Sequence, residues 1–303
     1  MPGRILVGTS SWADPEFVRD WYPPGLQPRA RLAYYAQRFE LVEVNSTFYQ
    51  VPPAQQVAQW VSETPAGFIF DVKLHRSLSR HRCEPRFLPK ALQKTAKISS
   101  SGGIVLTEDL QDAVLKCVLE SIGPLEKSGK LGVMLLQLSP SFSPRTATLE
   151  ELDGVVSKLA PRPLAFEFRN RGWVESPQEE KTLAYLSERN IGMVLVDAPR
   201  ADHFTIMPPT DYFTTPRLAY LRLHGRDAHA YLSGKTVADR FNYLYSEPEL
   251  FEIKQRAEVL AAHAEVLHVL FNNNRSNFAP KNAARFRQIL NQDVHEESQG
   301  LLF

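Results

Sequence analysis

The sequence has few cysteines and lacks a long hydrophobic run. Its two cysteines, Cys83 and Cys117, are too few for the disulfide framework of a small secreted domain. The longest apolar stretch lies near residues 132–136, far short of the roughly 20 residues that cross a bilayer. The apolar run close to the N-terminus, residues 5–7, is too short for a secretory signal. We therefore expect a protein of the reducing cytoplasm with no membrane segment.

The sequence also lacks an excess of charge of one sign. It has 35 Lys plus Arg against 34 Asp plus Glu, a formal net charge of +1, so no overall positive field attracts nucleic acid or anionic lipid. It contains neither a glycine-rich phosphate fingerprint after an early strand nor a G-x-S-x-G nucleophile motif. Of its 303 residues, 43% are hydrophobic and 23% charged, which is typical of a globular protein with a sizeable core.

Eight short β-rich runs recur along the chain, several of them almost continuously apolar, as expected for parallel strands covered on both faces. They are residues 5–8, 41–45, 68–73, 132–137, 164–168, 192–197, 218–224 and 266–272. Segments with apolar residues at helical spacing lie between most of these runs. This alternation predicts an α/β fold, a single-domain (β/α)8 TIM-type barrel over residues 1–290, with residues 291–303 as a flexible C-terminal tail. A doubly wound open sheet is the alternative, weakened by the missing glycine fingerprint.

Two connections depart from the regular pattern. The Ser-rich residues 99–103 indicate a loop-rich excursion between strands three and four. The segment 202–216, rich in Pro and Thr, shows no clear helix, so the connection between strands six and seven is expected to be irregular.

Polar residues stand at the ends of seven of these runs. Residues two apart share one face of a strand, and the carboxyl ends of barrel strands form the active-site mouth. Acids, bases and amides at these ends therefore predict a functional mouth, with a structural ion network as the alternative. The predicted catalytic acid/base groups are Glu43, Glu167 and His224. The predicted substrate-binding residues are Asn45, Tyr49, Lys73, Gln137, Arg169, Trp173, Asp197, Arg222, Arg226, Asn272 and Asn273.

Within this set, three arginines are the expected anion anchors: Arg169, Arg222 and Arg226. The segments containing Arg226 and Asn272 follow strands seven and eight, where barrels commonly bind phosphate. Carboxylates and a histidine are also ligand types for divalent metals, but the neighbouring cations would repel a metal ion. We therefore predict no metal and no other cofactor, and an anionic small molecule as the ligand.

These residues also carry a family resemblance. The segments Gly8-Thr9-Ser10-Ser11-Trp12, 42–49, 137–142, Glu167-Phe168-Arg169, 222–226, 271–273 and 279–283 resemble, in order, those of the domain-of-unknown-function family 72 (DUF72), the YecE-like proteins. The resemblance spans nearly the whole chain. It implies a TIM-type barrel but no established reaction. Ser11 and Ser139 stand where the family usually has Gly and Pro, and neither removes a candidate catalytic group.

The chain ends in the pentapeptide Gln299-Gly300-Leu301-Leu302-Phe303 after a polar stretch. This end is similar to the motif by which bacterial DNA-processing proteins bind the replicative sliding clamp, with Gln299 as the hydrogen-bonding group and Leu302 and Phe303 as pocket anchors. The alternative is that these residues pack back on the barrel or stay disordered.

The sequence thus supports three functional hypotheses. The first is a barrel enzyme, a hydrolase, lyase or isomerase of unassigned reaction, that acts on a phosphate- or carboxylate-bearing substrate by acid/base chemistry. The second is a DNA-repair phosphodiesterase or nuclease recruited to the sliding clamp by the tail. The third is a non-catalytic ligand sensor or adaptor, because a fold does not imply a function.

Overall fold

A computed structural model describes residues 2–273 and 275–292. Within them, eight parallel strands close into a barrel in which each strand pairs with the next and the last pairs with the first. The (β/α)8 fold predicted from the sequence is confirmed. The strands are β1 (Arg4–Thr9), β2 (Leu41–Val44), β3 (Ile69–Lys73), β4 (Leu131–Gln137), β5 (Leu164–Glu167), β6 (Gly192–Asp197), β7 (Leu218–Leu223) and β8 (Val266–Phe271).

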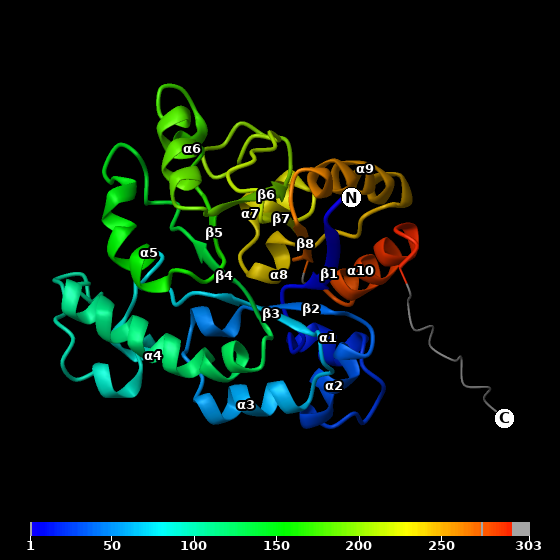
Figure 1. Cartoon of the computed structure of the whole chain (residues 1–303), viewed down its shortest axis with the longest axis horizontal. Coiled ribbons are helices and arrows are strands. Elements are labelled where there is room, and N and C mark those ends of the chain that lie inside the picture. Colours follow the sequence, from blue (N-terminus) through cyan, green and yellow to red (C-terminus); the bar gives the residue numbers. More distant parts are fainter. Residues whose placement is uncertain (1, 274, 293–303) are drawn as a thin grey trace.

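Helices surround the strands (Figure 1). They are α1 (Pro15–Asp20), α2 (Arg31–Ala36), α3 (Ala54–Ser62), α4 (Glu108–Lys127), α5 (Asp153–Leu159), α6 (Glu179–Glu188), α7 (Ala228–Ser233), α8 (Val237–Arg240), α9 (Glu247–Ala262) and α10 (Phe278–Ile289). The Thr107 hydroxyl caps the longest of them, α4, by accepting from the Leu110 amide. No helix of the described residues has the length and apolar character that a bilayer crossing requires.

Both irregular connections expected from the sequence are present. Residues 74–107, between β3 and α4, contain only short 3-10 turns and one isolated bridge, Ile98 with Ile104. Residues 198–217, between β6 and β7, form neither a helix nor a strand. The structure adds a feature that the sequence did not predict, because the short helices α7 and α8 lie between β7 and α9. Segments of this kind supply much of the wall of the site described below.

Strand alternation divides the apolar residues into two cores. The smaller one fills the barrel and includes Leu41, Leu135 and Leu218. The larger one, between strands and helices, includes their sequence neighbours of opposite parity, such as Val42 and Met134. Because successive side chains point to opposite faces, the parity of a strand residue decides whether it enters the barrel or faces a helix.

A carboxylate fixes an irregularity in β4. The register between β3 and β4 shifts between Phe70 and Val72, leaving β4 with one extra residue. The Asp71 side chain closes this bulge, since its Oδ1 accepts the Val133 amide at 2.7 Å and its Oδ2 lies 2.8 Å from His268 Nδ1. Gly132 makes the close approach possible, because a Cβ there would lie 2.3 Å from Asp71 Oδ1.

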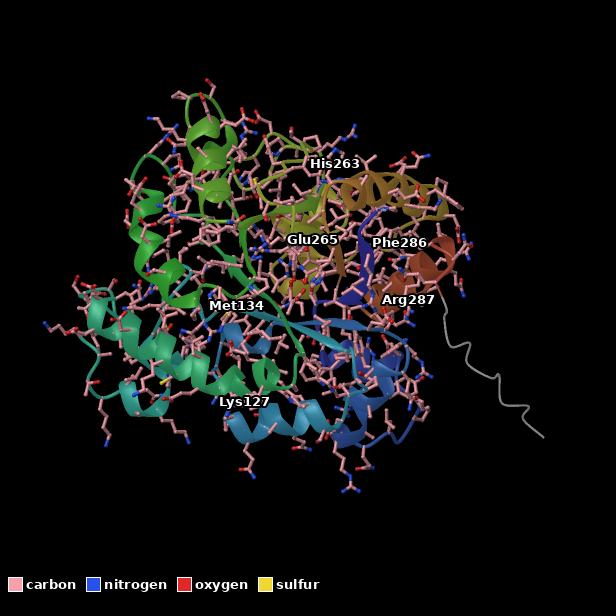
Figure 2. All side chains as sticks on the ribbon, viewed as in Figure 1. Lys127, Met134, His263, Glu265, Phe286 and Arg287 are labelled. Carbon is pink, nitrogen blue, oxygen red and sulfur yellow. The ribbon has the colours of Figure 1, made fainter. Side chains whose placement is uncertain are left out.

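The last helix completes the barrel wall. Phe286 of α10 is fully buried and its ring centroid lies 5.7 Å from that of Phe271 on β8 (Figure 2). Just after α10, Gln292 Nε2 donates to the Ile5 carbonyl of β1 at 2.9 Å. The predicted boundary at residue 290 stays a prediction, and residues 293–303 of the predicted tail lie outside the described residues.

Replacement of Gly132 by Ala is expected to destabilise the protein by about 1–3 kcal/mol, because the added methyl group overlaps Asp71 Oδ1 and the Ile69 side chain. Chemical denaturation of the purified protein measures this change. Gly123→Ala is the control: Gly123 lies in α4, and a Cβ there would meet nothing within 4 Å. We expect that control to leave stability unchanged or to raise it by up to about 1 kcal/mol. Equal losses at both positions would contradict the close-approach argument.

Candidate active site at the barrel mouth

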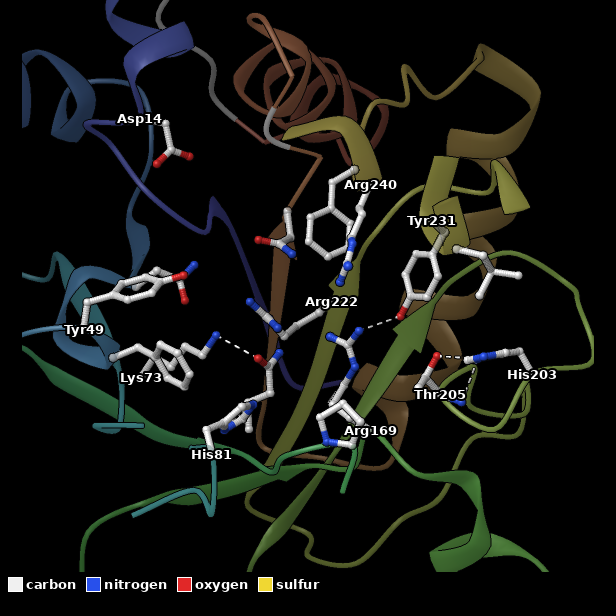
Figure 3. Close-up of a pocket in the computed structure, with 17 residues that line it drawn as sticks. Asp14, Tyr49, Lys73, His81, Arg169, His203, Thr205, Arg222, Tyr231 and Arg240 are labelled. Carbon is white, nitrogen blue, oxygen red and sulfur yellow. Dashed lines mark hydrogen bonds between the residues drawn. The ribbon is translucent and has the colours of Figure 1, made fainter. Parts of the chain in front are cut away.

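A cavity of about 660 Å³ lies at the carboxyl ends of the strands. Its volume lies within the range of small-molecule sites. Figure 3 shows side chains from several strands and from the following loops converging on it. The cavity is lined by Asp14, Asn45, Phe48, Tyr49, Lys73, His81, Gln137, Pro140, Arg169, His203, Thr205, Arg222, Tyr231, Leu232, Arg240, Phe241 and Asn272.

Arg222 of β7 joins two buried carboxylates beneath this cavity. Its Nη2 donates to Glu43 Oε1 at 2.6 Å, and its Nη1 donates to Glu167 Oε2. Glu43 also accepts from the Tyr220 hydroxyl at 2.8 Å. These side chains are at most 1% exposed. We refer to Glu43, Glu167 and Arg222 as the buried ion cluster.

The charges of the buried ion cluster stabilise one another. Burial alone would raise the pKa of Glu167, but the Arg222 charge and the contact with His224 hold it well below its ordinary value. Burial likewise lowers the pKa of Arg222, and Glu167 and Glu43 reverse this, so its pKa is raised. Glu167 therefore stays ionised at neutral pH and holds no proton to donate as a general acid.

A chain of amide and amine groups connects the buried ion cluster to the cavity. Gln137 Nε2 donates to Glu167 Oε1 at 2.8 Å, and Gln137 Oε1 accepts from Lys73 Nζ, also at 2.8 Å. Burial, together with the Arg222 charge, lowers the pKa of the Lys73 amine from 10.5 to about 7. Lys73 is therefore a cavity-lining group that can gain or lose a proton near neutral pH.

His224 occupies the position just after β7 and is 1% exposed. Its Nδ1 lies 2.9 Å from the Asn272 amide nitrogen, and its Nε2 lies 3.5 Å from Glu167 Oε1. An amide nitrogen can only donate, so Nδ1 accepts and the ring proton is on Nε2, facing Glu167. Burial lowers the pKa of His224 to about 4, so its ring is neutral at neutral pH and positions Glu167.

Connections beyond the strands supply the upper wall, where sequence reasoning missed several residues. Arg169 Nη2 donates to the hydroxyl of Tyr231 in α7 at 2.9 Å. Phe241 stacks on His224 with ring centroids 5.0 Å apart, and Arg240 lines the cavity beside it. No sequence signal marks these residues, because their place depends on how the segment after β7 folds back over the mouth.

Asp14 and His81 are further lining residues that the prediction omitted. Burial raises the pKa of Asp14 to about 6, and burial lowers the pKa of His81 to about 4. Both lie in loops that follow the carboxyl ends of β1 and β3. That position was a usable signal, since every loop at that end of a barrel borders the mouth.

Most of the predicted site residues converge as expected. The substrate-binding candidates that line the cavity are Asn45, Tyr49, Lys73, Gln137, Arg169, Arg222 and Asn272. The three predicted catalytic groups, Glu43, Glu167 and His224, lie directly below them rather than in the lining. Their placement favours a role through the residues above, as positioning groups.

Four predicted residues lie elsewhere. Asp197 has the opposite parity to Val194 and Val196, which pack inside the barrel, so it faces outward. There it accepts hydrogen bonds from Arg226 Nε and Nη2 at 2.9 and 2.8 Å, and this pair borders a second cavity. The proposed anion contact of Arg226 is thus not at the mouth.

Trp173 and Asn273 serve packing. The Trp173 indole is 1% exposed and donates to the Phe142 carbonyl at 2.8 Å. Asn273 Nδ2 donates to the Tyr243 carbonyl and to Asn282 Oδ1. Both side chains tie loops to the barrel instead of lining the mouth.

Among residues 2–273 and 275–292, no three His, Cys, Asp or Glu side chains gather closely enough to hold a metal ion. The clamp-binding residues predicted in the tail, Gln299, Leu302 and Phe303, lie outside the described residues. The clamp hypothesis therefore stays a prediction.

Comparisons with known proteins agree with this architecture. Residues 6–300 match the family model described as "Protein of unknown function DUF72". The UPF0759 protein YunF of Bacillus subtilis (strain 168) is 27% identical over 290 residues, covering 94% of each chain. A DUF72 family structure from Enterococcus faecalis V583 is 26% identical with a TM-score of 0.77, over 99% of this chain and 100% of that one. One from Thermotoga maritima MSB8 is 27% identical with a TM-score of 0.74, over 95% and 100%.

The amine of Lys73 is expected to react with acetic anhydride half-maximally near pH 7, because the neutral, nucleophilic form increases as the pH rises through its pKa of about 7. Mass spectrometry of the peptide containing Lys73 across a pH series measures the profile. The same peptide in denaturant is the control, and there the midpoint should move to the ordinary lysine value of about 10.4. Identical profiles in the native and denatured protein would contradict the shift.

Glu167→Gln is expected to cost about 3 kcal/mol or more of folding stability at neutral pH, since it removes a buried carboxylate that accepts from Arg222 and lies 3.4 Å from Arg169. Because the pKa of Glu167 is lowered on folding, this contribution is present above its ordinary value of 4.5 and is lost as the pH falls below that value. Denaturant titrations at neutral and acid pH measure both effects.

Glu40→Gln is the control for this substitution. Glu40 pairs with Arg4 on the surface, with side chains 50% and 61% exposed, so its loss should cost less than about 1 kcal/mol. A cost at Glu167 no greater than at Glu40 would refute the stabilising role of the buried ion cluster.

Proposed function

Because this chain belongs to the DUF72 family, whose description names no reaction, we propose from the chemistry of the barrel mouth that it is an enzyme for an anionic substrate. The substrate carries a phosphate or carboxylate group, and the reaction proceeds by acid/base chemistry at the mouth. One observation carries the proposal. Among the described residues, four cationic side chains line the cavity, Lys73, Arg169, Arg222 and Arg240, and a single carboxyl group, that of Asp14, lines it with them.

Cationic side chains line the cavity, whereas the carboxylates of the buried ion cluster are covered. The two carboxylates of the buried ion cluster are fully covered, and both accept from Arg222, which lies between them and the cavity. Arg222 and Arg169 reach the cavity, and neither Nε atom has a hydrogen-bond partner among the described residues. Buried donors without a partner favour a ligand that accepts hydrogen bonds, and guanidinium groups suit phosphate or carboxylate oxygens.

Lys73 is the acid/base group in this proposal. Its pKa of about 7 lets both protonation states exist at working pH, which is the condition for efficient proton transfer. Gln137 orients the amine, and Glu167 holds Gln137 in place. Glu43, Glu167 and His224 are positioning residues, because they act through Arg222, Gln137 and Asn272.

The proposal predicts that the full-length protein consumes at least one anionic compound from a polar metabolite extract, as measured by untargeted mass spectrometry. Lys73→Gln should lower the rate of that consumption by about 10²–10⁴-fold, the usual contribution of an acid/base group. Lys116→Gln is the matched control, since Lys116 is 78% exposed on α4, far in sequence from the mouth residues. It should leave the rate unchanged.

A binding measurement separates this enzyme from the sensor hypothesis. Calorimetric titration with inorganic phosphate should show binding that weakens about 10-fold or more in Arg169→Gln, the loss expected for one charged hydrogen bond. Phosphate binding without consumption of any compound would favour the non-catalytic sensor. If phosphate does not bind and no compound is consumed, the proposed anion site at the mouth is refuted.

A further inference from the structure

We propose that Lys73 forms a covalent imine with the carbonyl group of its substrate, so that the substrate class is an aldehyde or ketone that carries a phosphate or carboxylate. This inference rests on the proposed function and deepens it. It assigns Lys73 a nucleophilic role at the same site.

The surroundings of Lys73 leave its amine free to act as a nucleophile. No carboxylate of the described residues forms an ion pair with it, and its hydrogen-bond partner is the neutral Gln137 oxygen at 2.8 Å. On another side, Nζ lies 4.4 Å from the centroid of the Phe48 ring. An imine-forming lysine needs an uncharged amine, and proteins obtain one by desolvation or by a neighbouring cation. Lys73 has both, through its burial and through Arg222.

A second buried lysine shows that burial alone does not produce this arrangement. Lys130, just before β4, is 7% exposed. Its Nζ donates to three oxygens, the Val61 and Thr64 carbonyls and the Thr64 hydroxyl, at 2.8, 2.7 and 2.9 Å. All three protons of an ammonium thereby have an acceptor, and although burial lowers the pKa of Lys130, its amine points at backbone and the Thr64 hydroxyl instead of a cavity. Lys73 instead has one acceptor and faces the cavity (Figure 3).

The chemical step is balanced without a further reactant. The Nζ lone pair adds to the carbonyl carbon, a C–N bond forms, and the π electrons of the carbonyl move to its oxygen. The two protons of the amine then leave with that oxygen as water, and the C=N bond is formed. Nothing is oxidised or reduced.

The neighbouring cations define the rest of the substrate. Arg169, from the end of β5, and Arg222, from β7, line the cavity that Lys73 also lines. A phosphate or carboxylate held by these guanidinium groups would place an attached carbonyl carbon within the same small cavity. The charged or titratable groups that face Lys73 are Arg222 of β7, Glu43 of β2, Glu167 of β5, Arg169 just after β5, and His81 of the loop after β3.

Borohydride trapping of the full-length protein tests the inference. The probe is pyridoxal phosphate, an aldehyde that carries a phosphate, used at limiting concentration at pH 7 and followed by reduction and peptide mapping by mass spectrometry. We expect the peptide containing Lys73 to carry the reduced adduct in preference to peptides containing Lys130 or the exposed Lys116. Excess inorganic phosphate should suppress this adduct.

Two matched controls sharpen the result. Pyridoxal, the same aldehyde without its phosphate, should label Lys73 at least 10-fold less, because it lacks the group that Arg169 and Arg222 would hold. Lys73→Arg keeps the positive charge but has no amine of this reactivity, and should lose the adduct. If the Lys73→Arg variant does not fold, the comparison of Lys73 with Lys130 and Lys116 in the wild-type protein still tests the inference.

The outcomes separate the two proposals. If the probe binds and phosphate displaces it, yet no adduct forms at Lys73, the imine is refuted while the anion-binding enzyme stands. Labelling of Lys73 no greater than that of Lys116 also refutes the imine. If the probe neither binds nor labels, and phosphate does not bind, both proposals fail.

Discussion

The site depends on one interaction, the contact of the Arg222 guanidinium with Glu43 and Glu167 inside the barrel. Each buried ion carries a desolvation penalty of several kcal/mol, which is offset only by close, well-oriented partners. Two carboxylates on one guanidinium leave an excess negative charge in the upper barrel. Arg169 reduces that excess from the cavity side, with Nη1 3.4 Å from Glu167 Oε1. The polar residues of the mouth therefore form one coupled arrangement rather than separate contacts.

This coupling is why we propose Lys73, and not the carboxylates, as the acid/base group. Arg222 pairs with both Glu43 and Glu167, which are covered, and its charge helps to keep Glu167 ionised. The same Arg222 charge disfavours a second cation nearby, and together with burial it brings the amine of Lys73 close to neutrality. Gln137 links Lys73 to Glu167, because its neutral amide can accept from the Lys73 amine and donate to Glu167 at the same time. The Arg222 that pairs with the buried acids thus also helps to lower the pKa of an amine that lines the cavity.

The sequence predicted much of this site because the barrel converts a linear pattern into a spatial one. Parallel strands place their carboxyl ends together, so polar residues such as Lys73, Gln137 and Arg222 were expected to meet, and they do. The prediction failed where it ignored parity. Asp197 follows Val196 and therefore points away from the barrel interior, where it binds Arg226. Residues of the long connections, such as Tyr231 and Phe241, could not be located, since no local periodicity fixes how a loop folds back.

The sequence by itself determined the fold class and family and the approximate set of residues at the mouth, because period-2 alternation and strand order are local properties of the chain. Only the tertiary structure decided which of these residues reach the cavity and which lie beneath it. In the structure, Glu167 and His224 lie beneath the cavity, and Lys73 lines it. The physical reason is that burial and charge pairing depend on distances between segments remote in sequence, such as the 55 positions that separate Glu167 from Arg222, and no local pattern encodes such distances.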